Sequence, residues 1–161
     1  MIRRRAFFAT VVMIISMILT SGCVGYILAR PDSLIARLER EINRGREDRI
    51  LELYAEEIWI ATSGSPLGRT LPKDTVASFY ADFFELYDGI SYTVEVDRDR
   101  VERDSREATM TVFFTLDYSS GEEKYSKSGE SMIFLTGIDS QWKISGEFNN
   151  PIISLFEPAS M

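Results

Sequence analysis

The hydrophobic pattern of the chain changes period at Gly89, and no other feature limits the possible folds as strongly. Before Gly89, apolar residues recur every three or four positions, as they do on one face of a helix. After it, apolar and polar residues alternate, as they do on a strand with one buried face. A helical part followed by a strand part predicts an α+β domain with the helices on one face of a sheet.

Three stretches before this point carry apolar residues at helical spacing: 33–43, 47–57 and about 74–87. Gly45 is suited to end the first of these helices. Between the second and third helices, Ile58–Ala61 is typical of a short strand. Residues 62–73 hold two glycines and two prolines, which predicts a loop. The helices are therefore expected to form an N-terminal set of three.

Four stretches after Gly89 alternate between apolar and polar residues: 90–96, 108–118, 124–136 and 142–148. The residues expected to form the turns between them are Asp104–Ser105, Ser119–Gly121 and Asp139–Ser140. Consecutive strands joined by short turns predict an antiparallel meander. The expected fold is thus α+β, with three N-terminal helices packed on a four-stranded antiparallel sheet.

The first two dozen residues predict export and attachment to a membrane. Three arginines at positions 3–5 precede the apolar run Ala6–Leu19, and small residues then lead to Cys23. This order is similar to the bacterial lipoprotein signal, in which the cysteine after the cut receives a lipid. The alternative is an uncleaved helical anchor, because residues 6–29 carry no charge and about 20 apolar residues span a bilayer. Either way the rest is expected outside the cytoplasm, on the periplasmic side of the bacterial envelope.

The expected organisation has four parts: a signal peptide or anchor at 1–22, a tether at 23–31, one domain at 32–150 and a C-terminal tail at 151–161. Because the chain has no histidine and one cysteine, an internal disulfide and a histidine-activated nucleophile are excluded. Zinc or copper sites built on histidine and cysteine are excluded in the soluble part. No metal and no cofactor are expected. With a net charge of −7, the chain is not expected to bind nucleic acid.

The order of elements resembles the nuclear transport factor 2-like superfamily, also called SnoaL-like. The residues that carry the resemblance are Glu41–Gly45 leading into Leu51–Tyr54, the strand with Trp59, the Gly64–Arg69 loop, and Gln141–Ile144 in the last strand. It implies a cystatin-like cone, in which a curved sheet wraps over the helices around an internal pocket. The superfamily mixes isomerases, dehydratases, carriers and interaction domains, so the fold does not select a function.

The resemblance places a ligand pocket between the third helix and the concave face of the sheet. The candidate lining residues are Leu38, Trp59, Phe79, Phe83, Tyr92, Phe114, Tyr118 and Trp142. Residues of this kind at regular spacing are equally typical of a filled core. The predicted phases turn Asp82, Glu95 and Asp117 outward, so no inward acid and no catalytic residue are predicted.

Phe113, Ile133 and Leu135 are expected on the outer face of the sheet, where polar residues would be usual. Apolar residues there indicate a covered surface. The cover is either a second copy of the chain, giving a homodimer, or the chain's own residues 152–156.

These observations favour a membrane-tethered, extracytoplasmic domain that binds a small apolar ligand or an envelope protein without catalysis. The alternative is an isomerase-like or dehydratase-like enzyme that uses the cone for acid–base chemistry. A third interpretation is an assembly component that docks a partner on the outer sheet face. An inward Asp or Glu would favour the enzyme, a roomy cavity the ligand binder, and a filled cone with an apolar outer face the docking role.

Overall fold

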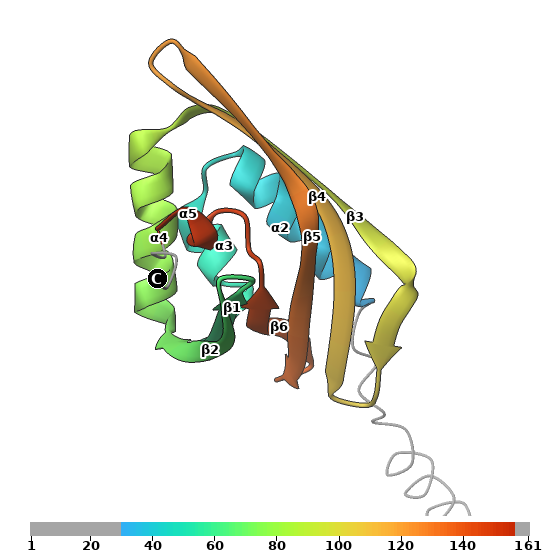
Figure 1. The fold of residues 1–161 in the computed structure, drawn as a ribbon. Coiled ribbons are helices and arrows are strands. Elements are labelled where there is room, and N and C mark those ends of the chain that lie inside the picture. Colours follow the sequence, from blue (N-terminus) through green and yellow to red (C-terminus); the bar gives the residue numbers. More distant parts are fainter. Residues whose placement is uncertain (1–29, 157–161) are drawn as a thin grey trace, which may run out of the picture.

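The computed structural model describes residues 30–156, which form a curved sheet with helices on its concave side (Figure 1). The elements are α2 (Pro31–Asn43), α3 (Glu47–Leu51), β1 (Tyr54–Thr62), β2 (Ser65–Pro72), α4 (Lys73–Leu86), β3 (Asp88–Arg103), β4 (Glu107–Ser120), β5 (Glu123–Ile138), β6 (Gln141–Phe148) and α5 (Ile153–Phe156). The predicted signal, the lipidation candidate Cys23 and most of the tether lie outside the described residues. Within residues 30–156, no helix combines the length and apolar character needed to cross a membrane.

The sheet has six strands in the order β2-β1-β6-β5-β4-β3. Neighbouring strands are antiparallel except β1 and β6, which run parallel. The α+β class is confirmed, whereas the four-stranded, purely antiparallel sheet is wrong. Ser65–Pro72, predicted as a loop, pairs with β1 as an edge strand. An edge strand hydrogen-bonds on one side only and therefore tolerates proline, so its glycines and prolines gave the appearance of a loop.

The helical part is also divided differently from the prediction. The second helix ends at Leu51 instead of reaching residue 57, and Tyr54 begins β1. The N–H of Ile144 donates to the Leu53 carbonyl at 2.8 Å, so pairing with β6 replaces helix at this point. Since β1 and β2 precede α4, the helices do not form one continuous N-terminal set. The predicted stop at Gly45 is confirmed, with φ +61° just after α2.

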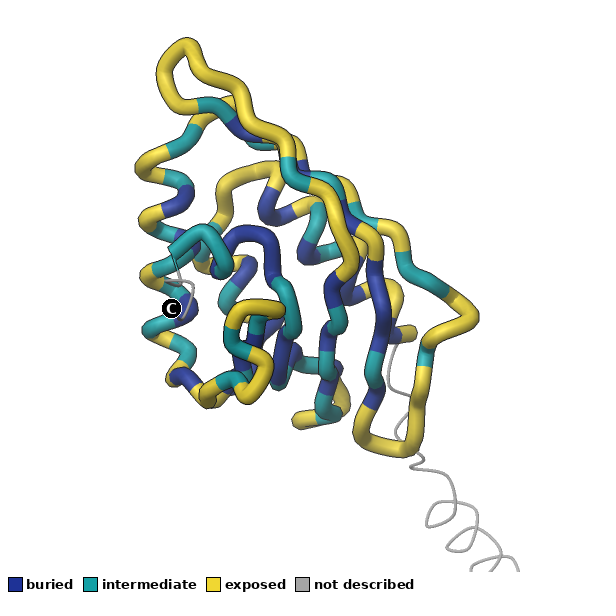
Figure 2. The backbone as a smooth tube through the Cα atoms, viewed as in Figure 1, coloured by how far each residue is buried: buried dark blue, intermediate teal, exposed yellow. Residues whose placement is uncertain are grey.

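The core lies between the concave face of the sheet and helices α2 and α4 (Figure 2). Fully buried side chains from these elements include Ile35, Leu38, Ile42, Val76, Tyr80, Phe83, Met110, Val112 and Leu116. Asn43 fastens the end of α2 to β3: its Nδ2 donates to the Tyr92 carbonyl and its Oδ1 accepts the Tyr92 N–H, both at 2.7 Å. This pair of bonds fixes the helix against the sheet.

The C-terminal segment 149–156 folds back over the concave side of the sheet. Ile152 and Ile153 are 1% and 0% exposed, and the Phe156 ring stacks on Phe79 of α4. Lys127, whose strand partner is the inward-facing Leu116, donates to Ser154 Oγ. The prediction that residues 152–156 cover the outer sheet face is therefore wrong, because they close the concave side instead.

The outer face carries a different apolar set from the one predicted. Ile133 and Leu135 pair with Met110 and Ala108, which point inward, and all four are buried. Phe113 is on the outer face as predicted and is 44% exposed. The phase of β5 was misread because apolar residues occupy four successive positions there, 132–135, so the sequence has no alternation to follow. The homodimer through this face stays a prediction.

Replacing Gly68 by alanine is expected to destabilise the fold more than the same change at Gly121. Both glycines have positive φ (+62° and +61°), so each variant loses about 1 kcal/mol of unfolding free energy. A Cβ at Gly68 would also lie 2.6 Å from Cε2 of Trp59, whereas Gly121 has no atom within 4 Å of that position. The clash adds roughly 1–3 kcal/mol. Urea unfolding measures both variants, and equal losses would contradict the close packing of Trp59 on Gly68.

Candidate functional site

Glu147 of β6 lies inside the domain and is 2% exposed. Its Oε2 accepts hydrogen bonds from the Tyr54 hydroxyl at 2.9 Å and from Asn150 Nδ2 at 2.8 Å. The Tyr54 and Tyr80 hydroxyl oxygens are 2.8 Å apart, and Asn150 Nδ2 is 3.4 Å from that of Tyr80. These four residues, Tyr54, Tyr80, Glu147 and Asn150, are called the buried polar cluster below.

A β-bulge at Ser145 turns Glu147 inward. Phe134 of β5 pairs with Gly146, but the next residue, Leu135, pairs with Ile144, so Ser145 is an extra residue on β6. Up to Ile144 the even-numbered residues of β6 face the core, and after the bulge Glu147 does. The alternation of Trp142 and Ile144 with their polar neighbours would have placed Glu147 outside. The prediction that no acid points inward is therefore wrong, and no local signal in the sequence marks the bulge.

Burial dominates the electrostatics of the cluster. It raises the pKa of Glu147 to about 7, although the hydrogen bonds from Tyr54 and Asn150 oppose the shift. Burial, together with the negative charge of Glu147, also raises the pKa of the Tyr54 hydroxyl well above its usual value. The pKa of Tyr92 is raised for the same two reasons, with a contribution from Tyr80. At neutral pH the carboxyl group of Glu147 is thus near the midpoint of its titration, and the tyrosine hydroxyls beside it are neutral.

A carboxylate with a pKa near 7 can act as a general base, and a phenol beside it can polarise a substrate oxygen. In this conformation, however, the hydrogen bonds of the buried polar cluster are made to other groups of the protein. Both donors reach the same oxygen of Glu147, and the Asn150 Oδ1 accepts the N–H groups of Ile152 and Ile153, each at 2.9 Å. A substrate would have to displace this C-terminal segment to reach the carboxylate.

The predicted pocket residues are mostly part of the core. Leu38, Phe83, Tyr92, Phe114, Tyr118 and Trp142 are buried, and Phe79 packs against them. Aromatic contacts such as Phe83–Tyr118, with ring centroids 5.7 Å apart, join several of them directly. Trp59 lies apart, because its strand partners place it on the outer face with its ring edge-to-face against Phe134. A ligand pocket formed by the inward residues stays a prediction.

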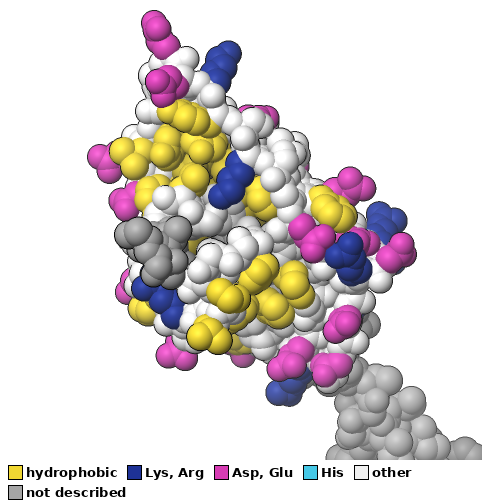
Figure 3. Space-filling model, in the orientation of Figure 1, with side chains coloured by type: hydrophobic (Ala, Val, Ile, Leu, Met, Phe, Trp, Pro, Cys, Tyr) yellow, Lys and Arg dark blue, Asp and Glu magenta, His cyan; other side chains and the backbone are white. Residues whose placement is uncertain are grey.

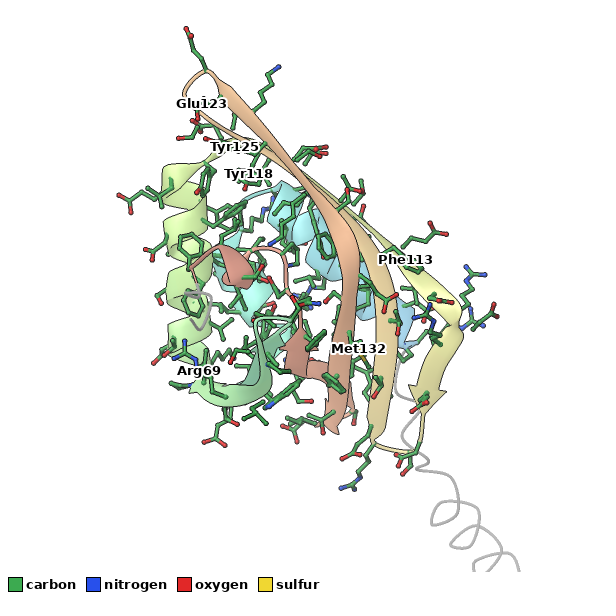
Figure 4. The ribbon with its side chains drawn as sticks, in the orientation of Figure 1. Arg69, Phe113, Tyr118, Glu123, Tyr125 and Met132 are labelled. Atoms are coloured by element: carbon green, nitrogen blue, oxygen red, sulfur yellow. The ribbon has the colours of Figure 1, made fainter. Side chains whose placement is uncertain are left out.

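Aromatic side chains also gather where the β4–β5 hairpin approaches the end of α4 (Figures 3 and 4). Tyr118 and Tyr125 stack with their ring centroids 5.2 Å apart, and Tyr87 meets Tyr118 at 4.7 Å. Tyr125 is 40% exposed and donates to Glu123. Since these rings contact one another, they form a closed stack and leave no cage between them.

A hollow of about 470 Å³ lies beside the edge of β5, between the β1–β2 turn and the segment that joins β6 to α5. It exists because β6 pairs only with Met132–Ile138, so the earlier part of β5 runs on without a partner on that side (Figure 1). Lys127 lies in this hollow, and burial lowers the pKa of its ammonium group. This feature, called the Lys127 hollow, had no counterpart in the sequence-based predictions. In residues 30–156, no three side chains of the metal-binding types come together.

Comparison with known proteins gives matches by structure only: no protein-family model matches the chain, and no curated protein does. A ketosteroid isomerase-like protein from Erwinia carotovora atroseptica is 15% identical, with a TM-score of 0.62 over 75% of this chain and 92% of that one. A scytalone dehydratase-like protein from Novosphingobium aromaticivorans is 12% identical, with a TM-score of 0.63 over 73% and 78%. A nuclear transport factor 2-like protein of unknown function from Shewanella oneidensis is 15% identical, with a TM-score of 0.56 over 72% and 92%.

The chain has the nuclear transport factor 2-like fold. At these identities the likeness concerns the fold alone, and function has to be argued from the residues. The two interior features of this nuclear transport factor 2-like domain that bear on function are the buried polar cluster and the C-terminal segment that closes over it.

Glu147→Gln is expected to remove a pH dependence of stability. The folded pKa of Glu147, about 7, lies above the ordinary carboxyl value of 4.5, so between these two pH values the native state keeps its proton while the unfolded state loses it. The unfolding free energy of the wild type should therefore fall by about 3 kcal/mol between pH 4.5 and 7 through this group, and then level off. Urea unfolding at several pH values should show this fall reduced in the variant. Glu57→Gln, a change at an exposed position of β1, should leave it intact.

Proposed function

We propose that this chain is a membrane-tethered, extracytoplasmic binding domain that does not catalyse a reaction. The observation that supports it best is the closure of the concave side by the chain's own C-terminal segment, with Ile152 and Ile153 fully buried. The inward carboxylate of Glu147 is engaged by Tyr54 and Asn150. Because the segment that ends at residue 156 closes the concave side, we place binding at the surface, in the Lys127 hollow.

The membrane tether is proposed from the N-terminal sequence. A lipid on Cys23 would supply more than one acyl chain, which is what stable anchoring without a spanning helix requires. The basic residues before the apolar run would keep the start of the chain in the cytoplasm and the domain outside.

Mass spectrometry of the chain purified from bacterial membranes is expected to show a mature N-terminus at Cys23 carrying a diacylglycerol group. Cys23→Ser should abolish the lipid, because the thiol is the only group that forms the thioether. It should also leave the signal uncut. A wild-type chain that retains Met1 without lipid would contradict the lipoprotein signal and support the uncleaved anchor.

The second candidate function is an acid–base enzyme, favoured by one specific observation. Glu147 has a pKa of about 7 and is hydrogen-bonded to the Tyr54 hydroxyl, a pairing suited to moving a proton next to a polarised oxygen. Two of the structurally similar proteins are described as ketosteroid isomerase-like and scytalone dehydratase-like. Catalysis would require segment 149–156 to leave the concave side.

A β,γ-unsaturated ketosteroid tests this candidate, because its isomerisation to the conjugated enone can be followed by ultraviolet absorbance. The wild type is expected to convert it no faster than Glu147→Gln, since the carboxylate is covered by Asn150 and the residues after it. Tyr54→Phe provides a second comparison. A wild-type rate clearly above that of both variants would overturn the non-catalytic proposal in favour of the enzyme.

A further inference from the structure

Lys127 is a half-buried cation that has no acidic partner in the part of the chain that the structure describes. Its ammonium nitrogen donates to Ser154 Oγ at 2.6 Å and to the Pro151 carbonyl at 3.4 Å, and both acceptors are neutral. Within residues 30–156 it forms no ion pair, although the chain carries a net charge of −7. A partly desolvated ammonium group held by neutral partners favours the approach of an anion.

The other groups around the Lys127 hollow are held in place by the fold and include further donors. Asn149, at φ +59°, accepts the Ser63 N–H on its Oδ1 at 2.7 Å, which leaves its Nδ2 as a donor. The Ser63 hydroxyl and the Gly64 backbone belong to the same turn. Groups fixed by backbone bonds lose little entropy when a ligand arrives.

Among residues 30–156, the one carboxylate that lines the hollow, Glu130, does not cancel the charge of Lys127. Glu130 accepts a hydrogen bond from the Arg100 guanidinium at 3.1 Å, and that arginine lies on β3, across the outer face of the sheet. Phe113, the residue that pairs with Glu130 on β4, also lies on the outer face. Among the described residues, the balance of charge inside the hollow is therefore positive.

We propose that the Lys127 hollow binds a small hydroxylated monocarboxylate, the chemistry of a sugar acid. The proposal rests on the binding function proposed above and names its ligand class. One ammonium group matches one carboxylate in charge, and the hydrogen bond between them is charge-assisted. The Ser63 hydroxyl and the Asn149 amide can form hydrogen bonds with the ligand's hydroxyl groups. Gly129, where a Cβ would lie 3.2 Å from the Phe114 ring, leaves an apolar edge of that ring at the hollow for the ligand's carbon skeleton. A volume of about 470 Å³ is within the range of small-ligand sites.

Binding of D-glucuronate to the full chain in detergent micelles tests the proposal, measured by saturation-transfer NMR and calorimetry. D-glucose is the uncharged comparison, and inorganic phosphate is the anion without a sugar. Glucuronate is expected to bind and glucose is not. Lys127→Met should weaken glucuronate binding at least about tenfold, because a hydrogen bond to a charged group is lost. Lys127→Arg should retain most of the binding.

Lys124→Met is the matched control, since it makes the same change on β5 outside the hollow and should leave binding within about twofold. Thermal unfolding shows whether each variant remains folded. Equal weakening by both methionine variants, or no binding of glucuronate, would overturn the proposal. Phosphate binding that depends on Lys127, without glucuronate binding, would overturn the sugar-acid class but leave the binding function standing. Failure of the non-catalytic function proposed above would appear separately, as turnover in the ketosteroid assay, which does not involve Lys127.

Discussion

The parallel pairing of β1 with β6 is the constraint on which the interior of this domain depends. It joins Tyr54 to Ile144 and Ile60 to Glu147, residues that are far apart in the sequence. Because paired residues of a sheet face the same side, this register places the Tyr54 hydroxyl within hydrogen-bond reach of the Glu147 carboxylate. The same pairing extends the sheet past β6 to β1 and β2.

Asn150 connects the polar interior to the closure of the domain. Its amide nitrogen donates to Glu147, while its amide oxygen accepts the N–H groups of Ile152 and Ile153 at the start of the C-terminal segment. The Asn150 side chain thus hydrogen-bonds both the buried carboxylate and the backbone at the start of α5. A buried carboxyl with a raised pKa is often a catalytic feature, but here the groups that satisfy it also hold the cover in place.

In residues 30–156 the C-terminal segment closes the concave side, and an open recess lies at the rim of the sheet. There β5 extends beyond the end of β6. The unpaired edge of β5 and the nearby turns border the Lys127 hollow. The same fold in other proteins carries isomerase-like and dehydratase-like descriptions, which shows how little the backbone alone determines. In the described part of this acidic chain, the hollow holds a lysine whose hydrogen-bond acceptors are both neutral.

The sequence by itself determined the α+β class, the end of the first helix at Gly45 and the absence of histidine chemistry, because these depend on composition and on local hydrophobic period. Only the tertiary structure decided that Tyr54 begins a strand, that Ser65–Pro72 pairs as an edge, and that Glu147 points inward. Each of these depends on which strand lies alongside. A bulge or an edge position is a property of the pairing between distant segments, and the alternation within one segment does not record it.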